Sequence, residues 1–372
     1  MKIVIIANTS WHVFNYRKGL IKFLQKEGHE ISVFASHDDY VNKLTQLGVK
    51  HFTLPITQRG TNPFSEIKLL IKLLQLLRNT RPEVVLTFTI KCNLYTGICR
   101  NLVKFIQIAN ISGLGEAFDK KGILNYIISL LYKFAMARSK AVFFQNNEDM
   151  QTMINAKLLP GNLCRRIPGS GVDLSLYCFA SPPKNSPRIF FMFGRLLPQK
   201  GYDLFMKTAK EIYLREKRCA EFWIMGIIDN SRKESKMLLE QILSYQKQGI
   251  VKYLPPSDDV IAVLRQVDVV VLPSKYNEGV PHSLLEAMAC GKPIITTDWK
   301  GCRDTVEDGV NGYLVDVNNF NALLQCVLKL ANAPDEQLEK MGRMSRLRAE
   351  EKFDENIVFK AYKAEISIKS YD

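Results

Sequence analysis

The sequence lacks several patterns that would place it in a common class of protein. Its 372 residues contain no stretch of about 18 uncharged apolar residues, the length that a membrane-spanning helix needs. The eight cysteines include no C-x-x-C pair, so we expect reduced cytosolic thiols in a core rather than a disulfide framework. No G-x-G-x-x-G follows the first apolar run, and G-x-x-x-x-G-K-[ST] is absent, which removes the usual support for nicotinamide and P-loop nucleotide sites.

Spacings that suit metal ligands are missing as well. No two aspartates are spaced D-x-D, and the five histidines show no H-x-x-x-H pattern. We therefore expect no metal ion and no other cofactor.

The positive charge of the chain is unevenly distributed. Residues 1–180 hold 23 Lys and Arg against 11 Asp and Glu, a net charge of +12, which leaves +2 for residues 181–372. A basic first half indicates an anionic partner: nucleic acid, anionic lipid headgroups or a phosphorylated substrate. The alternative is that the charge serves solubility alone.

Short β-branched and aromatic runs alternate with helical patterns, which is typical of βαβ units with parallel sheets, an α/β fold. The length favours two domains, and Ser-Pro-Pro-Lys-Asn-Ser-Pro at residues 181–187 interrupts regular structure between them. We therefore expect Rossmann-like domains at residues 1–180 and 181–354. The expected strands cover residues 2–7, 30–35, 49–54, 83–89, 105–111 and 141–145, then 188–193, 222–226, 250–254, 268–273, 293–297 and 313–317.

The ends of the chain carry their own expectations. The apolar run at residues 2–7 passes into polar residues without a small-residue cleavage site, so we expect a buried strand and not a signal peptide. Residues 336–370 read as helical throughout and are available to pack on either domain.

A basic loop follows the first strand of the second domain. Arg195 and Lys200 place two cations on it, Gly194 allows close backbone approach, and the next helix begins with its N-terminus pointing the same way. This arrangement suits a diphosphate, bound where open α/β sheets bind ligands, at the carboxyl ends of strands facing a cleft. The alternative is a solvated basic loop.

Two glutamates follow a later strand of the same domain. Glu278 lies on a loop, and Glu286 lies in the first turns of the helix that Pro281 begins. They can bind different hydroxyl groups of one ligand while the amides of residues 279–282 face its anionic part. Alternatively, Glu286 merely lies near a helix N-terminus and Glu278 faces water.

Together these motifs resemble the donor-binding half of family-4 retaining glycosyltransferases. The resemblance implies the GT-B architecture, two facing Rossmann-like domains with a C-terminal crossover helix, here residues 355–372, that packs back on the N-terminal domain. Gly171-Val172-Asp173 then corresponds to the interdomain segment. The resemblance rests on Phe193-Gly194-Arg195 with Lys200-Gly201, Glu278-x7-Glu286, Glu286-Ala-Met-Ala-Cys-Gly-Lys-Pro-Ile-Ile295 and Gly301-Cys-Arg-Asp-Thr-Val-Glu-Asp-Gly-Val-Asn-Gly-Tyr-Leu-Val315.

Motifs in the first half are similar to a bacterial subgroup of this family, which adds a hexosamine to a sugar linked to undecaprenyl diphosphate. That subgroup implies a UDP-sugar donor carrying GalNAc or GlcNAc, and a polyprenyl-diphosphate-linked acceptor of N-glycan, O-antigen or capsule assembly. It also implies a peripheral position on the anionic cytoplasmic face of the bacterial inner membrane. The motifs are Leu47-Gly48-Val49-Lys50, Asn62-Pro63-Phe64 and Gly113-Leu114-Gly115.

The resemblance assigns roles to single residues. It gives the donor diphosphate to Arg195 and Lys200, the ribose hydroxyls to Glu286, and the transferred sugar to Glu278. The catalytic residues are then Arg195, Lys200 and Glu278, and the remaining donor-binding residues are Gly194, Tyr253, Leu254, Gly279, Val280, Pro281, His282 and Glu286, with the base near Tyr253 and Leu254. The expected acceptor-binding residues are Ser10, Trp11, His12, Arg17, Gly113 and Gly115.

The acceptor side departs from the family pattern. Many members have a Gly-Gly pair in the first loop, whereas this chain reads Asn8-Thr-Ser-Trp-His-Val-Phe-Asn-Tyr-Arg17, which we expect to form a loop followed by a helix from residue 15. For Trp11 and Arg17, acceptor contact and local packing are equally consistent with the sequence.

The chemistry follows from the bond that is broken. When the sugar–phosphate bond breaks, negative charge develops on the oxygens of the leaving diphosphate, and Arg195, Lys200 and a helix N-terminus would stabilise it. The departing phosphate can take the acceptor proton on the same face, so the resemblance implies retention without a covalent intermediate. A glycosidase would instead use two flanking carboxylates and has no use for a cationic diphosphate site.

A helix expected over residues 63–79 is a candidate for the membrane surface. Lys68, Lys72 and Arg78 on it, like Lys120, Lys121 and Lys133 further on, would be attracted to an anionic leaflet. Alternatively, its leucines simply belong to the core.

Two other functions remain open from the sequence. A hydrolysing epimerase acting on a nucleotide sugar shares the fold but has no use for a basic membrane face. A nucleic-acid-binding protein suits the pI of about 9.3, yet the basic half shows no recognisable nucleic-acid-binding module, so we expect no such partner.

Overall fold

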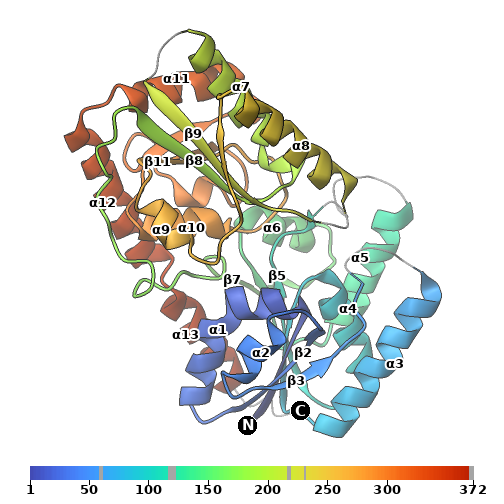
Figure 1. The fold of residues 1–372 in the computed structure, drawn as a ribbon. Coiled ribbons are helices and arrows are strands. Elements are labelled where there is room, and N and C mark those ends of the chain that lie inside the picture. Colours follow the sequence, from blue (N-terminus) through green and yellow to red (C-terminus); the bar gives the residue numbers. More distant parts are fainter. Residues whose placement is uncertain (58–61, 116–122, 216–218, 230–231, 368–372) are drawn as a thin grey trace. The chain divides into compact units, whose positions relative to one another are not determined.

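The computed structural model describes residues 1–57, 62–115, 123–215, 219–229 and 232–367 (Figure 1). The chain divides into two compact units: unit 1 comprises Met1–Ser170 with Glu355–Asp372, and unit 2 comprises Gly171–Asp354. The boundary therefore lies at Ser170 and not at residue 180. The segment after it is attached to unit 2, because Arg346 donates a 2.7 Å hydrogen bond to the carbonyl of Tyr177.

Unit 1 is built on a seven-stranded parallel sheet in the order β3-β2-β1-β4-β5-β6-β7. The six expected strands are confirmed, and the short β7 was missed because its sequence, Cys-Arg-Arg, has no β-branched run. The strands are β1 Lys2–Thr9, β2 Glu30–Ser36, β3 Lys50–Thr53, β4 Val84–Phe88, β5 Ile106–Ile111, β6 Ala141–Phe144 and β7 Cys164–Arg166.

Helices cover both faces of this sheet, so its strands read as nearly continuous apolar runs. The odd residues Ile3 and Ile5 of β1 pack with α1 and α13, while the even residues Val4 and Ile6 pack with α3 and α4. A third cluster joins α4 and α5 to β5 and β6 on the second face. The helices are α1 Ser10–Lys26, α2 Val41–Thr45, α3 Pro63–Thr80, α4 Ile90–Cys99, α5 Ile123–Met136, α6 Asn147–Asn155 and α13 Glu355–Ser367.

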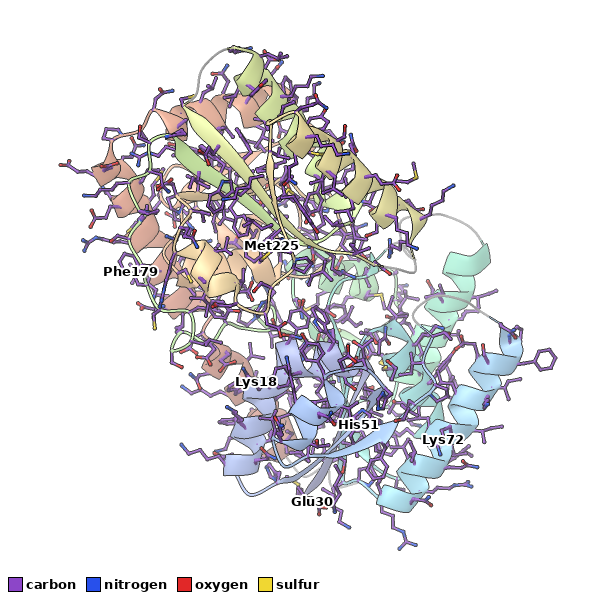
Figure 2. All side chains as sticks on the ribbon, viewed as in Figure 1. Lys18, Glu30, His51, Lys72, Phe179 and Met225 are labelled. Atoms are coloured by element: carbon purple, nitrogen blue, oxygen red, sulfur yellow. The ribbon has the colours of Figure 1, made fainter. Side chains whose placement is uncertain are left out.

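Unit 2 is built on a six-stranded parallel sheet in the order β10-β9-β8-β11-β12-β13, and all six expected strands are confirmed. Buried side chains such as Met225 fill the space between sheet and helices (Figure 2). The strands are β8 Arg188–Arg195, β9 Ala220–Ile227, β10 Lys252–Leu254, β11 Val269–Leu272, β12 Ile294–Thr297 and β13 Gly312–Val315; the helices are α7 Tyr202–Leu214, α8 Lys233–Lys247, α9 Val260–Leu264, α10 His282–Ala289, α11 Phe320–Ala331 and α12 Asp335–Lys352.

The helical tail is broken into two parts that belong to different units. α12 packs on α10 in unit 2, where a Cβ at Gly342 would lie 2.3 Å from the Gly291 carbonyl, and α13 packs on α1 in unit 1. The break falls at Asp354, which forms a β-bridge with Val172. None of the described helices is long and apolar enough to cross a bilayer.

Candidate active site

The strand order of unit 2 reverses between β8 and β11, the type of position at which open α/β sheets bind ligands. The loops that leave these strands meet there. The Lys275 amide donates a 2.8 Å hydrogen bond to the Gln199 carbonyl, and Gly201 has φ +86°. A Cβ on Gly201 would lie 2.2 Å from the Pro273 carbonyl, so only glycine fits this contact.

The structure brings Lys200 and Glu278 together at this point. Lys200 closes the short 3₁₀ turn Pro198–Lys200, and its Nζ donates to Oε1 of Glu278 at 2.7 Å and to Oε2 at 2.9 Å. The lysine is buried and the carboxylate is largely so. A bound anion would compete with Glu278 for the ammonium group of Lys200. The pair therefore places a cation that can exchange its partner at the carboxyl edge of the sheet.

Arg195 and Gly194 end β8 beside this pair. The guanidinium of Arg195 lies 5.8 Å from the centre of the Tyr276 ring, on the loop that also carries Glu278. Gly194 has φ +139°, and its carbonyl accepts a 3.2 Å hydrogen bond from the hydroxyl of Tyr202. Two cations therefore lie at one edge beside a glycine with no atom within 4 Å of an added Cβ, an arrangement that suits a diphosphate.

Glu286 is held in place by two side chains. Its Oε1 accepts a 2.6 Å hydrogen bond from the hydroxyl of Tyr177 and lies 3.0 Å from Nδ1 of His282, one helical turn earlier. Among the described residues, neither partner's bond goes to Oε2 of Glu286, which leaves that oxygen for ligand hydroxyls. His282 is the first residue of α10, the helix that the sequence predicts to begin at Pro281.

The rest of the donor loop is fixed by backbone packing. Pro281 is the N-cap residue of α10, and Val280 is buried. The Gly279 carbonyl lies 2.1 Å from where a Cβ on Gly301 would be, so the two loops touch. The amides of this segment are thus held at the start of α10.

Tyr253 and Leu254 end the edge strand β10. The Tyr253 hydroxyl donates to the Gly226 carbonyl at 3.3 Å, and burial raises the pKa of Tyr253. Burial above all, and then the proximity of Tyr253 and Glu278, raises the pKa of Tyr202. Tyr202 therefore remains a neutral hydrogen-bond donor close to Gly194, Tyr253 and Glu278, three of the expected site residues.

Sequence reasoning missed Tyr177 and Tyr202. Tyr177 lies 109 positions before Glu286 in the sequence, on the first segment of unit 2, and no local motif marks it. Tyr202 is the first residue of a helix and reads from the sequence as an ordinary core aromatic.

The first acceptor segment is helical from Ser10, so the loop that we expected before a helix start at residue 15 is wrong. β1 extends to Thr9, whose side chain accepts from the His12 amide and caps α1. Ser10 donates to the Ser36 carbonyl at 2.8 Å, and the Trp11 amide donates to Asp38 at 2.9 Å. These caps replace the glycine loop of the family pattern.

Arg17 packs in the core of unit 1. It is 3% exposed, and its guanidinium lies 4.1 Å from the centre of the Phe88 ring. Burial lowers the pKa of Arg17. Of the two interpretations that the sequence left open, the structure favours packing for this residue.

Gly113 and Gly115 follow β5 and have φ +121° and +61°, conformations that favour glycine. A Cβ on Gly115 would meet no described atom within 4 Å. Likewise, no three His, Cys, Asp or Glu side chains of the described residues are grouped as a metal ion would need.

Comparisons with known proteins agree with this geometry. The family Glycosyl transferase 4-like matches residues 2–146, and Glycosyl transferases group 1 matches residues 178–348. The protein is therefore a glycosyltransferase. More specifically, it belongs to the family-4 glycosyltransferases with the GT-B fold, the family that its donor-loop motifs resemble.

Two curated relatives show which enzymes it is similar to. It is 26% identical, over 100% of this chain and 98% of the relative, to the N,N'-diacetylbacillosaminyl-diphospho-undecaprenol α-1,3-N-acetylgalactosaminyltransferase of Campylobacter jejuni. It is 23% identical to an Escherichia coli UDP-Gal:α-D-GlcNAc-diphosphoundecaprenol α-1,3-galactosyltransferase, over 87% of this chain and 85% of the relative.

Solved structures share the fold. Anabaena HepE in complex with UDP and glucose has a TM-score of 0.80 at 18% identity, covering 99% of both chains. A glycosyltransferase from Rickettsia africae has a TM-score of 0.79 at 18% identity, covering 100% of this chain and 99% of that one.

Proposed function

We propose that the protein transfers a hexosamine, GalNAc or GlcNAc, from a UDP-sugar to a sugar linked to undecaprenyl diphosphate in the assembly of a cell-surface glycan. Unit 2 binds the donor and unit 1 the acceptor. The observation that carries this proposal is the meeting of Arg195, Lys200, Glu278 and Glu286 at the strand-order reversal of unit 2. The full-length similarity to the Campylobacter enzyme supports the choice of acceptor.

Each group has a chemical task in this proposal. Arg195 and Lys200 stabilise the charge that develops on the leaving UDP, and preorganised contacts of this kind contribute several kcal/mol each, about 3 kcal/mol for one good donor. On donor binding, Lys200 exchanges Glu278 for phosphate oxygens, and the released carboxylate can accept from the sugar hydroxyls. Glu286 binds the ribose through Oε2.

The proposal includes retention of anomeric configuration, no covalent intermediate and no metal ion. Two fixed cations at the diphosphate supply the charge stabilisation for which other enzymes use a divalent metal. The proposed location is the cytoplasmic face of the bacterial inner membrane, as a peripheral protein, since the acceptor is a lipid.

The test is product formation with a panel of UDP-sugars, each offered to short-chain polyprenyl diphosphates that carry GlcNAc or a bacillosamine-type sugar. We expect one donor to extend one acceptor, with an α-linkage by NMR and the same rate in EDTA. A β-linked product would contradict retention, and loss of turnover in EDTA would contradict metal independence. Hydrolysis of the donor without extension of any acceptor would overturn the proposed function.

A further inference from the structure

Unit 1 exposes two apolar stripes that the donor chemistry does not use. On α3, Phe64, Ile67 and Ile71 are 82%, 56% and 52% exposed, although the leucines on the opposite side of the same helix are buried. On α5, the side chains of Ile127, Leu130 and Phe134 are 47%, 47% and 61% exposed. Both sets have the spacing i, i+3, i+7, which places each set along one side of its helix.

The two stripes belong to the same layer of helices. α3 and α5 both pack against α4 over one face of the unit 1 sheet, and α4 lies between them with most of its residues buried (Figure 1). Since the buried side of each helix faces the sheet or α4, the stripes lie on the outside of this layer. We call the six residues with Lys68 and Lys72 the α3/α5 face.

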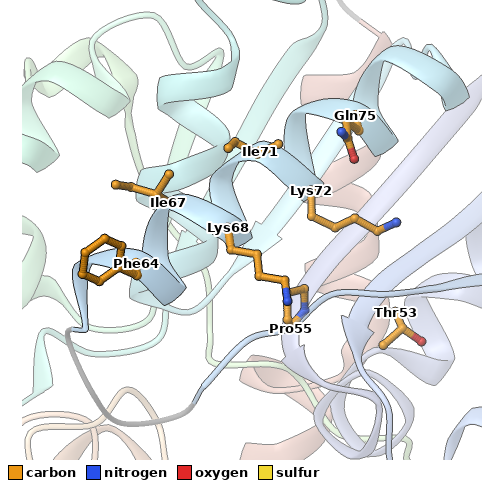
Figure 3. A pocket seen from close by; sticks show the side chains of 8 residues that line it. All are labelled: Thr53, Pro55, Phe64, Ile67, Lys68, Ile71, Lys72 and Gln75. Atoms are coloured by element: carbon orange, nitrogen blue, oxygen red, sulfur yellow. The ribbon is translucent and has the colours of Figure 1, made fainter.

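A groove runs along the α3 part of this face. It has a volume of about 560 Å³ and lies between α3 and the segment after β3. Figure 3 shows Phe64, Ile67 and Ile71 along the helix, with the Lys68 side chain reaching toward Pro55. The groove is therefore apolar along its length with cationic groups at its border.

Among the described residues of α3 and α5, Glu66 is the single acidic one, and it lies away from the stripes. Lys68 and Lys72 flank the α3 stripe, and Figure 2 places Lys72 on the side of unit 1 where α3 lies. Glu66, the one acidic residue of α3, is turned toward α4, where it accepts from Lys91 at 2.6 Å and from the Tyr95 hydroxyl at 2.6 Å. Its charge is thus compensated away from the stripe.

The whole unit has the same bias. Unit 1 contains 26 Lys and Arg against 13 Asp and Glu, a net charge of +13, whereas unit 2 has 25 against 24, a net charge of +1. The exposed apolar rows are bordered by lysines and lie on the unit that carries nearly all the excess positive charge. This combination is complementary to a lipid bilayer, whose headgroups are anionic and whose interior is apolar.

We propose that the α3/α5 face docks on an anionic phospholipid bilayer, with the two stripes at the acyl boundary and Lys68 and Lys72 at the depth of the phosphates. The proposal deepens the proposed function and rests on it in one respect: a lipid-linked acceptor requires the protein to work at a bilayer. It names the surface that would bring unit 1 to a lipid-linked acceptor.

Vesicle flotation tests the docking directly. The wild type should float with vesicles of phosphatidylcholine and phosphatidylglycerol in equal parts, and less with phosphatidylcholine alone or at high salt. Each lysine near an anionic surface contributes about 1 kcal/mol, so Lys68→Gln with Lys72→Gln should weaken partitioning about 30-fold. Because all the chosen side chains are exposed, these variants should fold.

The apolar stripes are tested separately. Phe64→Ser with Ile71→Ser, and Leu130→Ser with Phe134→Ser, should each weaken partitioning by at least about tenfold, since each pair removes two large side chains from the lipid boundary. The matched control is Lys210→Gln with Leu214→Ser on α7 of unit 2, where Leu214 is 64% exposed. This control should float like the wild type.

Other outcomes decide against the proposal. Absent flotation of the wild type, or equal flotation of all variants, would overturn it, as would binding to duplex DNA in preference to vesicles. Transfer to a short-chain acceptor without vesicles separates docking from catalysis, because the docking variants should retain wild-type turnover there. Loss of that turnover in Lys68→Gln with Lys72→Gln would place the lysines in the acceptor site instead. Vesicle binding without transfer to any acceptor would leave the docking intact and refute the proposed function.

Discussion

At the residue scale, each functional group of the site is held in position by only one or two other side chains. Glu286 is the clearest case, because Tyr177 and His282 both bind the same carboxylate oxygen. A carboxylate held in this way presents its other oxygen in a defined direction, which lowers the entropy that is lost when a ligand hydroxyl binds.

Removal of the Tyr177 hydroxyl should therefore weaken donor binding without removing a catalytic group. A hydrogen bond to a charged group contributes about 1.5–3 kcal/mol, and His282 remains, so Tyr177→Phe should raise the Kd for UDP about tenfold. Calorimetric titration with UDP measures this, with Tyr213→Phe at an exposed position of α7 as the control. Unchanged affinity in Tyr177→Phe would show that the bond does not orient Glu286.

Lys292 predicts a pH dependence of stability. Burial lowers the pKa of its ammonium to about 8 from the ordinary value of 10.5, and its Nζ donates to the Ala180 carbonyl at 3.3 Å. Between pH 8 and 10.5 the unfolded chain binds more protons than the folded chain, so the cost of burying this group falls and the free energy of unfolding rises with pH. Below pH 8 its cost is fully present.

Lys292→Met removes that titration. Its free energy of unfolding minus that of the wild type should fall by about 3 kcal/mol as the pH rises through this window. Urea unfolding at a series of pH values gives the difference, in which the buried cysteines that do not interact with Lys292 cancel. A difference that does not vary with pH would be inconsistent with a charged lysine at this position below pH 8.

The sequence located the charged residues of the site but not their supports. Arg195, Lys200, Glu278 and Glu286 lie in short motifs whose residue types already suit a diphosphate and hydroxyl groups. Tyr177 reaches Glu286 because the first segment of unit 2 packs on α10, a long-range contact that no local pattern encodes.

At the scale of elements, strands were the most predictable feature. A strand buried on both faces, such as β11, needs an unbroken apolar run, and the sequence shows such runs directly. The start of α1 was misjudged because Asn8 to Arg17 is polar and aromatic. This segment is helical because the Thr9 side chain caps it and because Asp38, on the loop after β2, accepts from the Trp11 amide.

The loop between β8 and α7 provides a prediction at this scale. Gly201→Ala should destabilise unit 2 by about 2–3 kcal/mol. The alanine would have to adopt the left-handed backbone conformation, and its Cβ would also clash with the Pro273 carbonyl. Gly249→Ala is the matched control, since Gly249 has φ +72° but no atom within 4 Å of the added Cβ. Thermal unfolding in the two variants separates the contact from the backbone cost, and equal losses would contradict the close packing.

At the scale of the whole molecule, the two units divide the charge and the chemistry. Unit 2 is nearly neutral and carries the two cations of the donor site, Arg195 and Lys200, whereas unit 1 carries nearly all the excess positive charge and is the unit that we assign to a lipid-linked acceptor. The doubly wound fold of each unit was readable from its repeated βα pattern. The boundary at Ser170 was not, because the proline-rich segment that suggested residue 180 lies within unit 2.

The central claim is that the site in unit 2 drives transfer of a sugar from UDP to a lipid-linked acceptor, and UDP release tests it most directly. With the matching donor, the wild type should release UDP only when the polyprenyl-diphosphate-linked acceptor is present. Arg195→Ala and Glu286→Ala should each lose at least about 100-fold of that rate, while Lys210→Gln should retain it. UDP release that needs no acceptor, or that survives both substitutions, would contradict the account.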